Sequence, residues 1–388
     1  SRELLLIKNK SNNFEIIGED LNIIEVENTE FALGDIARYY KSKFDIPYIG
    51  ITGSVGKTST RDMVFSAVSS KFKTLNNQFG VPLTLANLDK SYECAVIEMG
   101  MSGFNEIEYL VNIVNPQIGV ISNIGLSHVE RLGSREGIFK AKITTNFDEN
   151  STLIVNGDDD MLATLKGKDL KYNLKTFGFE KDNTIYCVDF EMNDNDTIFN
   201  VMIDNKIEKF YIPTVGEHNI YNAMAAILVG QTLNLTLDEI RNGLETLEIT
   251  KSRMDVIKND NYTVIDSVYN ASVDSMRAAL KVLNRYKTRR VAILGDIFEM
   301  GSFAEEGHKQ VGKDASENAD VIIAIGKDAE FISKEALENN MNKDNVHHFA
   351  TKEEAMENFK DILQKGDTIL VKASRGMHLE EVVEFLNK

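Results

Sequence analysis

The chain has 388 residues, of which 43% are hydrophobic and 27% charged, as expected for a soluble globular protein of two or three domains. Its formal net charge of −17 argues against nucleic acids and anionic membrane surfaces as main partners. The two cysteines, Cys94 and Cys187, are too few for a four-cysteine zinc site and indicate a reducing compartment or the absence of a redox role. No apolar stretch has the length of a transmembrane helix. We therefore expect a cytoplasmic protein without stable membrane insertion.

The first 46 residues contain too few apolar positions for a core of their own. Residues 21–26 are compatible with a strand, and Thr29 is expected to cap a helix that runs to Phe44. The chain begins with serine, not methionine. We therefore interpret residues 1–46 as the end of a domain that precedes this sequence.

Strand and helix patterns alternate from Ile46 onward, which predicts a mainly parallel sheet wrapped by helices. The expected strands are 48–51, 94–97, 118–122 and 152–155, and the expected helices are 58–70, 218–233 and 238–247. Residues 186–211 alternate polar and apolar side chains and predict a small antiparallel hairpin sheet on the same domain.

A second α/β pattern begins near residue 253. Its expected strands are 263–265, 291–294, 321–325 and 368–371. The predicted fold class is α/β, with a central P-loop-type parallel sheet domain, a Rossmann-like C-terminal domain and a partial N-terminal domain. The expected domain ranges are 1–46, 47–250 and 251–388.

The most informative motif joins the strand 48–51 to the helix 58–70. It is a glycine-rich turn, and its residues are Gly53, Ser54, Val55, Gly56, Lys57, Thr58 and Ser59. Backbone N–H groups in such a turn bind phosphate, Lys57 would reach the β- and γ-phosphates, and the Thr58 hydroxyl would bind Mg²⁺. The general P-loop pattern requires glycine where Ile51 stands, so this is a variant of that motif.

Other polar residues follow predicted strands, where parallel α/β sheets bind ligands. Glu98 ends the strand 94–97, and His128 lies in the loop after 118–122. Together with Thr58 they are candidates for a magnesium site, although a solvated strand end and an ordinary loop histidine are equally simple interpretations. For Lys142, fourteen residues beyond His128, an ordinary surface lysine is the favoured interpretation from spacing alone.

Asn219 and Asn222 stand three apart at the start of the helix 218–233, where two amides can read an adenine edge or act only as caps. Arg253, at the expected domain boundary, is placed to reach a γ-phosphate when the domains close. Asp266 follows a strand and is a candidate for ribose binding. The loops 295–301 and 372–376 are also strand-end loops.

Taken together, these segments resemble the Mur ligase family of ATP-dependent amide-forming ligases. The turn 52–59 has the family's own P-loop form, and residues 218–226 match its adenine-side helix. Within the family, the chain is most similar to members that add D-alanyl-D-alanine to the UDP-N-acetylmuramoyl tripeptide in peptidoglycan precursor synthesis. The segments that carry this similarity are 75–84, 98–103, 265–271 and 294–301.

The resemblance implies a role for each candidate. ATP would be held by the turn, Asn219, Asn222, Arg253 and Asp266. Two Mg²⁺ ions would be bound by Thr58, Glu98 and His128, and also by Lys142 once CO₂ has converted it to a carbamate. Catalysis would depend on Lys57, His128, Lys142 and Arg253. Substrate contacts would come from Asn76, Asn77, Ser102, Tyr269, Asn270, Asp296, Glu299, Lys372, Ser374 and Arg375.

The implied reaction proceeds through an acyl phosphate, and we expect a monomer. Two departures from the family matter. The residue two positions after Lys142 is Thr144, where the family often has an acidic residue. Residues 1–46 would be only the end of the UDP-binding domain. The alternatives are another Mur-type ligase with a different acceptor, and an inactive truncated chain that still binds ATP.

Overall fold

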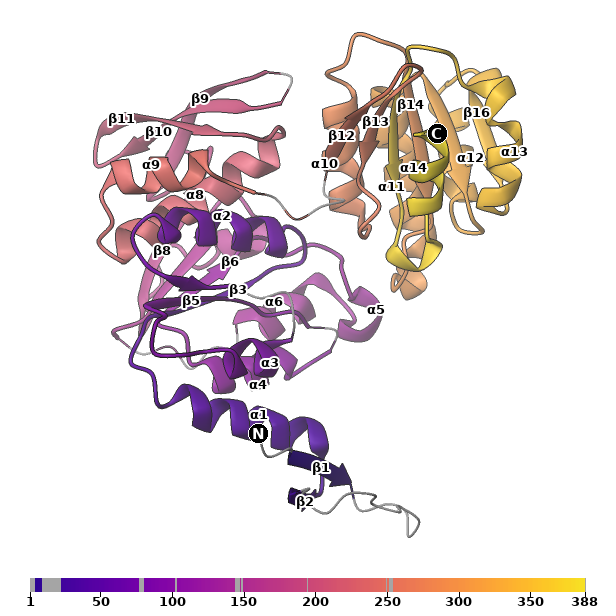
Figure 1. Ribbon diagram of the computed structural model, residues 1–388. Helices are drawn as coiled ribbons and strands as arrows, with labels where there is room; N and C mark the ends of the chain where they lie inside the picture. The colour runs from indigo at the N-terminus through magenta and orange to yellow at the C-terminus, as the bar shows by residue number, and fades with distance from the viewer. Residues whose placement is uncertain are drawn as a thin grey trace.

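Two α/β bodies, each built on its own sheet, form most of the computed structural model (Figure 1). The structure describes residues 4–8, 22–76, 80–101, 103–143, 147, 149–193, 195–248, 250 and 254–387. Within these ranges, no helix is both long and apolar enough to cross a lipid bilayer. Both bodies have the strand and helix alternation that the sequence predicts.

Nine strands form the sheet of the first body, in the order β11-β10-β9-β8-β7-β6-β3-β5-β4. They are β3 (Tyr48–Thr52), β4 (Thr74–Leu75), β5 (Cys94–Glu98), β6 (Ile118–Ile121), β7 (Thr152–Asn156), β8 (Asn173–Gly178), β9 (Ile185–Met192), β10 (Thr197–Ile203) and β11 (Lys206–Ile212). Neighbours are parallel from β4 to β9, and β9, β10 and β11 are antiparallel.

The antiparallel strands expected over 186–211 are present, but the separate hairpin sheet is a wrong prediction. The start of β9 pairs with the end of β8, where Phe177 lies opposite Ile185 and Gly178 opposite Tyr186. Backbone groups at the end of β8 thereby gain hydrogen-bond partners. The strands β9, β10 and β11 extend the parallel part of the sheet instead of forming a sheet of their own.

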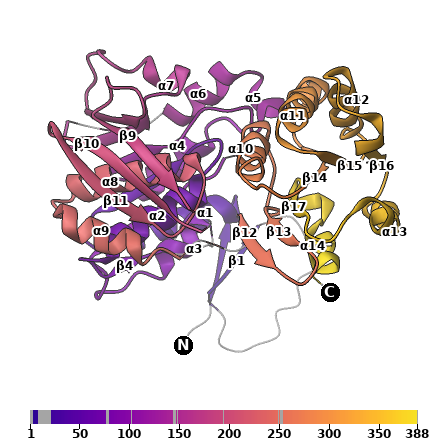
Figure 2. The same ribbon diagram turned by 90° about the horizontal axis from the view of Figure 1, so that it is seen from above.

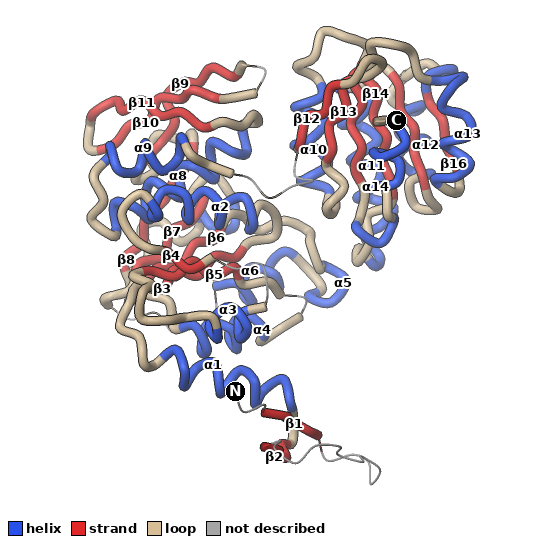
Figure 3. The backbone as a smooth tube through the Cα atoms, viewed as in Figure 1, coloured by secondary structure: helices blue, strands red, loops and turns tan. Residues whose placement is uncertain are grey.

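Helices cover both faces of this sheet (Figure 3). They are α2 (Lys57–Ser69), α3 (Val81–Ala86), α4 (Glu106–Val114), α5 (Val129–Leu132), α6 (Arg135–Ile143), α7 (Asp160–Ala163), α8 (Glu217–Thr232) and α9 (Leu237–Glu245). Met63 and Val64 of α2 are fully buried against the sheet and α8. Each such burial contributes about 1.5–3 kcal/mol, so α2 is firmly held behind the turn that it follows.

The N-terminal segment contains α1 (Thr29–Lys41), together with β1 (Leu4–Lys8) and β2 (Asn22–Val26), which pair in parallel. The cap of α1 is Asn28, not the expected Thr29, because the Asn28 Oδ1 accepts hydrogen bonds from the N–H groups of Glu30 and Phe31 at 2.8 and 3.2 Å. The helix also ends three residues before Phe44. It packs against α3 and α4 of the first body.

Six strands form the second sheet, in the order β12-β13-β17-β14-β15-β16. They are β12 (Asp255–Lys258), β13 (Thr263–Asp266), β14 (Arg290–Gly295), β15 (Val321–Ile325), β16 (Val346–Phe349) and β17 (Thr368–Lys372), all parallel except β12. The helices are α10 (Val273–Leu283), α11 (Ala304–Asn318), α12 (Glu330–Glu338), α13 (Lys352–Ile362) and α14 (Glu380–Leu386). The first three share one core with the sheet, and the last two share another.

The second body lies beside the first, with α10 and α5 between the two sheets (Figure 2). The loops that follow β3 and β6 and the last residue of β5 contribute to the same cavity as the loop that follows β13 and the last residue of β17. Its volume is about 450 Å³. Since ligands of open α/β sheets bind at the carboxyl ends of strands, this cavity is the candidate site.

Candidate functional site

The glycine-rich turn is held in place by the end of β6. Ser54 N–H donates to Asn123 O at 3.0 Å, and Val55 N–H donates to the Asn123 side chain at 2.9 Å. Gly53 has φ +150°, and a Cβ there would lie 1.9 Å from the Ser122 Oγ. Only glycine therefore allows this close approach, which leaves the cradle before the N-terminus of α2 preformed.

Two lysines meet at the backbone of this turn. The Lys57 Nζ donates to the carbonyl oxygens of Gly53 at 2.9 Å and Ser54 at 3.2 Å, and the Lys142 Nζ donates to Gly53 O at 3.1 Å. Lys142 is 1% exposed, so an ordinary surface lysine, the interpretation favoured by spacing alone, is wrong. Burial, and then the charge of Lys57, hold the pKa of Lys142 well below its usual value. An amine that is easily neutral is therefore buried against the backbone of the turn, outside the lining of the cavity.

Thr58 and Glu98 form the hydroxyl–carboxylate pair that the motif predicts. The Thr58 Oγ1 donates to both Glu98 carboxylate oxygens, at 2.9 and 3.1 Å. Hard oxygen donors of this kind suit Mg²⁺, which is bound in proteins by one or two carboxylates together with substrate phosphates. Among the described residues, no cluster of three or more His, Cys, Asp or Glu side chains forms an all-protein metal site. The donors therefore fit a magnesium ion that arrives with a nucleotide.

His128 also lines the cavity, and its side chain contacts the second body. Its Nδ1 is 2.6 Å from the Glu299 Oε2. Burial lowers the pKa of His128, while the Glu299 carboxylate opposes that shift. The imidazole therefore links the loop after β6 to the loop after β14.

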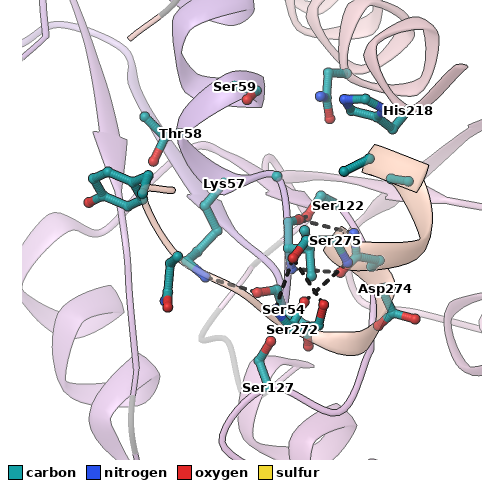
Figure 4. Close-up of a pocket in the computed structure, with 18 of the residues that line it drawn as sticks. Ser54, Lys57, Thr58, Ser59, Ser122, Ser127, His218, Ser272, Asp274 and Ser275 are labelled. Carbon is teal, nitrogen blue, oxygen red and sulfur yellow. Dashed lines mark hydrogen bonds between the residues drawn. The ribbon is translucent and has the colours of Figure 1, made fainter. Parts of the chain in front are cut away.

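The start of α8, which includes His218, forms another wall of the cavity (Figure 4). Asn219 and Asn222 are both buried there. The Asn219 amide donates to Val215 O at 2.8 Å, and the Asn222 amide donates to Asn219 Oδ1 at 3.2 Å. The two amides thus order each other and the preceding turn while they line the cavity.

The second body contributes a lysine and an aromatic ring. Lys372 is buried at the end of β17, and its Nζ donates to Ser267 O, Ser267 Oγ and Asn270 O at 3.2, 3.1 and 2.9 Å. The Arg375 guanidinium lies 5.2 Å from the centroid of the exposed Tyr269 ring. Lys372, Tyr269 and Asn270 all line the cavity.

Several predicted site residues do not line the cavity. The Asp296 carboxylate accepts from the N–H groups of Lys327 and Ala329 at 3.2 and 2.7 Å, so it orders the turn after β15. The Ser374 Oγ accepts from Phe298 N–H at 2.8 Å. The remaining described residues outside the lining are Asp266, whose carboxylate accepts from Val268 N–H, together with Gly53, Asn76, Lys142, Glu299 and Arg375. Asn77, Ser102 and Arg253 lie outside the described residues.

Other residues at the site were missed by sequence reasoning. Ser122, Asn123 and His218 line the cavity, as does Asp274, whose Oδ2 would lie 2.1 Å from a Cβ placed on Gly125. The only signal for Ser122 and Asn123 is their position directly after a buried strand. Asp274 comes from α10, in the second body, and no spacing in the sequence links it to Gly125.

The sequence matches two families, the Mur ligase middle domain over residues 51–230 and the Mur ligase, glutamate ligase domain over residues 252–375. The UDP-N-acetylmuramoyl-tripeptide–D-alanyl-D-alanine ligase of Bacillus subtilis (strain 168) is 36% identical over 381 residues, which cover 95% of this chain and 82% of the relative. The corresponding ligase of Escherichia coli (strain K12) is 32% identical, with 95% and 83% covered.

Solved structures agree with these relatives. A crystal structure of MurF from Acinetobacter baumannii superposes with a TM-score of 0.86 at 28% identity, and the match covers 96% of this chain and 84% of that one. The expected α/β fold with two sheets is therefore confirmed.

Proposed function

The chain belongs to the Mur ligase family, and we propose that it is the ATP-dependent ligase that joins D-alanyl-D-alanine to the UDP-N-acetylmuramoyl tripeptide in peptidoglycan precursor synthesis. The observation that carries this proposal is the 36% identity to a ligase of that name over 95% of the chain. The cavity supports it, because the glycine-rich turn, a hydroxyl–carboxylate pair, Lys57 and the buried Lys372 converge there.

The reaction has two bond-forming steps. A carboxylate oxygen of the tripeptide attacks the γ-phosphorus of ATP, the bond from that phosphorus to the β–γ bridging oxygen breaks, and ADP leaves. The amine of D-alanyl-D-alanine then attacks the acyl carbon, loses a proton and expels phosphate. The protein's contribution to such transfers is positioning and charge neutralisation.

Lys57 and the turn supply most of that neutralisation. The Lys57 ammonium rests on the carbonyl oxygens of Gly53 and Ser54, from where it can turn toward the β- and γ-phosphates. The backbone N–H groups at the start of α2 point to the same place. These fixed dipoles lose little energy to reorganisation when charge moves onto ADP.

The metal ions are proposed to lie at the two ends of the phosphate site. Thr58 and Glu98 would hold one Mg²⁺, and the neutral imidazole of His128 would help to hold a second. Such ions lower the repulsion between an anionic carboxylate and ATP. In a protein with a net charge of −17, this local positive charge has to come from bound metal and a few lysines.

Lys142 is proposed to carry a carbamate. Its nitrogen would attack CO₂, form a nitrogen–carbon bond and release a proton to solvent, which requires a neutral amine. Its burial and lowered pKa meet that requirement. The test is a ¹³C NMR spectrum of the protein in ¹³C-bicarbonate. A carbamate resonance that is lost in Lys142→Arg, but kept in the Lys140→Arg control on the same helix, is the expected result.

Nucleotide and acceptor are proposed to be recognised by residues of the cavity wall and by further residues outside its lining. Asn219 and Asn222 are proposed to face the adenine, Asp266 the ribose and Arg253 the γ-phosphate. The cluster around Lys372 is proposed to meet the acceptor, with contacts from Asn76, Asn77, Ser102, Tyr269, Asn270, Asp296, Glu299, Ser374 and Arg375. Since the reaction consumes ATP, we also propose a cytoplasmic location, and the monomeric state stays a prediction.

Phosphate release with ATP, Mg²⁺, the UDP-muramoyl tripeptide and D-alanyl-D-alanine, omitting one component at a time, tests the function. Release that requires both the tripeptide and the dipeptide is the expected result. Release with another acceptor in place of D-alanyl-D-alanine would favour a different Mur-type ligase. Release without any acceptor would reduce the proposal to a plain ATPase.

A further inference from the structure

Two charged residues are buried behind the phosphate-binding turn, one helical turn after Lys57. Arg61 and Asp62 of α2 are 3% and 5% exposed. Charged side chains are almost never fully buried unless they are paired. The Arg61 Nε and Nη2 donate to the Asp62 Oδ1 at 3.1 and 2.7 Å, which satisfies one carboxylate oxygen and leaves one guanidinium nitrogen for another partner.

That nitrogen reaches the candidate magnesium ligand. The Arg61 Nη1 donates to the Glu98 Oε2 at 3.3 Å, on the same carboxylate that accepts the Thr58 hydroxyl. A guanidinium is planar and keeps its charge at every pH relevant here, so it can fix the orientation of a carboxylate. Arg61 therefore holds Glu98 in place from the side opposite the cavity.

The other end of the pair reaches the segment that leaves the first body. Thr250 is the last described residue before the second body, and the next described residue is Met254. Its N–H and Oγ1 donate to the Asp62 Oδ2 at 3.0 and 2.8 Å, and its Oγ1 accepts from the Arg61 Nη2 at 3.2 Å. One continuous network thus runs from Glu98 through Arg61 and Asp62 to Thr250.

We propose that Arg61 and Asp62 are a positioning pair that couples the magnesium–nucleotide site to the connection between the two bodies. The proposal rests on the proposed function for the metal role of Glu98. When Glu98 binds Mg²⁺, its carboxylate is fixed. Through Arg61 and Asp62, the position of Thr250 is then fixed as well. Such coupling is reciprocal, so loosening Thr250 weakens Mg²⁺ binding.

Thr250→Val is the sharpest variant, because it removes no buried charge and touches neither Glu98 nor the nucleotide. The readout is the Mg²⁺ concentration that half-saturates binding of N-methylanthraniloyl-ATP, measured by fluorescence without acceptors. We expect this concentration to rise about threefold. Thr246→Val is the matched control, because its hydroxyl donates to Gly243 O at the end of α9, outside the network. The control should leave the Mg²⁺ requirement unchanged.

Arg61→Lys and Arg61→Met test the other end of the network. Lysine keeps the charge but cannot reach Asp62, Glu98 and Thr250 together, so we expect about a tenfold rise in the Mg²⁺ requirement and no change in Mg²⁺-free nucleotide affinity. We expect Arg61→Met to raise the Mg²⁺ requirement at least as much as Arg61→Lys does. Small-angle X-ray scattering with and without Mg²⁺ and AMP-PNP should show a smaller ligand-induced change in the radius of gyration in all three network variants.

A Thr250→Val protein with a lower melting temperature and the wild-type Mg²⁺ requirement would reduce the pair to a structural role and overturn the proposal. A different result would contradict the proposed function without contradicting the network. In that case the wild type would bind nucleotide with Mg²⁺ but release no phosphate that depends on both acceptors, while the shift in Thr250→Val would still support the network.

Discussion

The Nδ1 of His128 lies 2.6 Å from the Glu299 Oε2, and this pair joins the loop after β6 to the loop after β14. Both residues have left-handed backbones, with φ values of 64° and 62°. Such conformations are uncommon outside glycine and are found often at functional sites. Because the side chains are 22% and 48% exposed, the pair contributes at most about 1 kcal/mol, enough to bias the arrangement of the bodies but not to lock it.

Glu299→Ala should therefore change how the bodies are arranged without destabilising either one. We expect a changed small-angle scattering profile for the nucleotide-free protein and a melting temperature close to that of the wild type. Glu305→Ala, which removes the surface pair with Lys309 in the same body, should change neither. An unchanged profile in Glu299→Ala would mean that this contact has no influence on the arrangement.

A second contact between the bodies lies next to the start of α8, the helix proposed to face the adenine. The Arg285 Nη2 donates to Met192 O at 2.7 Å, and the Met192 Sδ accepts from Gly216 N–H at 3.2 Å, directly before α8. Arg285→Ala should raise the KM for ATP about threefold with a smaller effect on kcat, because only the wall proposed to bind the base is loosened. Lys281→Ala, on the exposed surface of α10, is the control. A loss confined to kcat would contradict this assignment.

Lys57→Ala tests the phosphate site itself. Without the ammonium, charge that develops on the γ-phosphoryl group loses its nearest cation, and acceptor-dependent phosphate release should fall at least about 100-fold. Lys57→Arg should recover part of the rate, since it restores the charge but not the geometry. Wild-type turnover in Lys57→Ala would remove this residue from the mechanism.

Much of the fold follows from local patterns. The strands around the turn are runs of apolar residues such as Ile49 and Ile51, and both are fully buried in the first sheet. The turn could be recognised because it needs glycine where no Cβ fits, as at Gly53. The pair of Thr58 with Glu98 was predictable because parallel strands end at one edge of a sheet.

What the sequence could not predict depends on contacts between distant segments. The burial of Lys142 comes from its approach to Gly53, 89 positions away. Arg61 and Asp62 look like the exposed face of an amphipathic helix until Glu98 and Thr250 surround them. Glu299 was predicted as a substrate contact, and the structure places it against His128, 171 positions away. No local periodicity encodes such pairs.

His218 makes the stability of the protein dependent on pH. Burial, and then the charge of Lys372, lower its pKa to about 4, against about 6.5 in an unfolded chain. Because the unfolded chain binds the proton more tightly, His218 favours folding least at low pH. Its contribution is complete above pH 6.5 and is lost as the pH falls toward 4. The residue as a whole is half-buried at the cavity wall, so we expect a loss of about 1–2 kcal/mol between pH 7 and pH 5.

His218→Gln should lack this part of the pH dependence, since an amide does not titrate. The measurement is the free energy of unfolding in urea at pH 7 and pH 5, for the wild type and the variant. Comparing the two proteins cancels the other groups that titrate in this range. His378→Gln, which removes an exposed imidazole of the second body, controls for the loss of any histidine. An equal loss of stability in the wild type and in His218→Gln would show that His218 is free to be protonated in the folded protein, and that the cavity wall around it is more open to water than this arrangement implies.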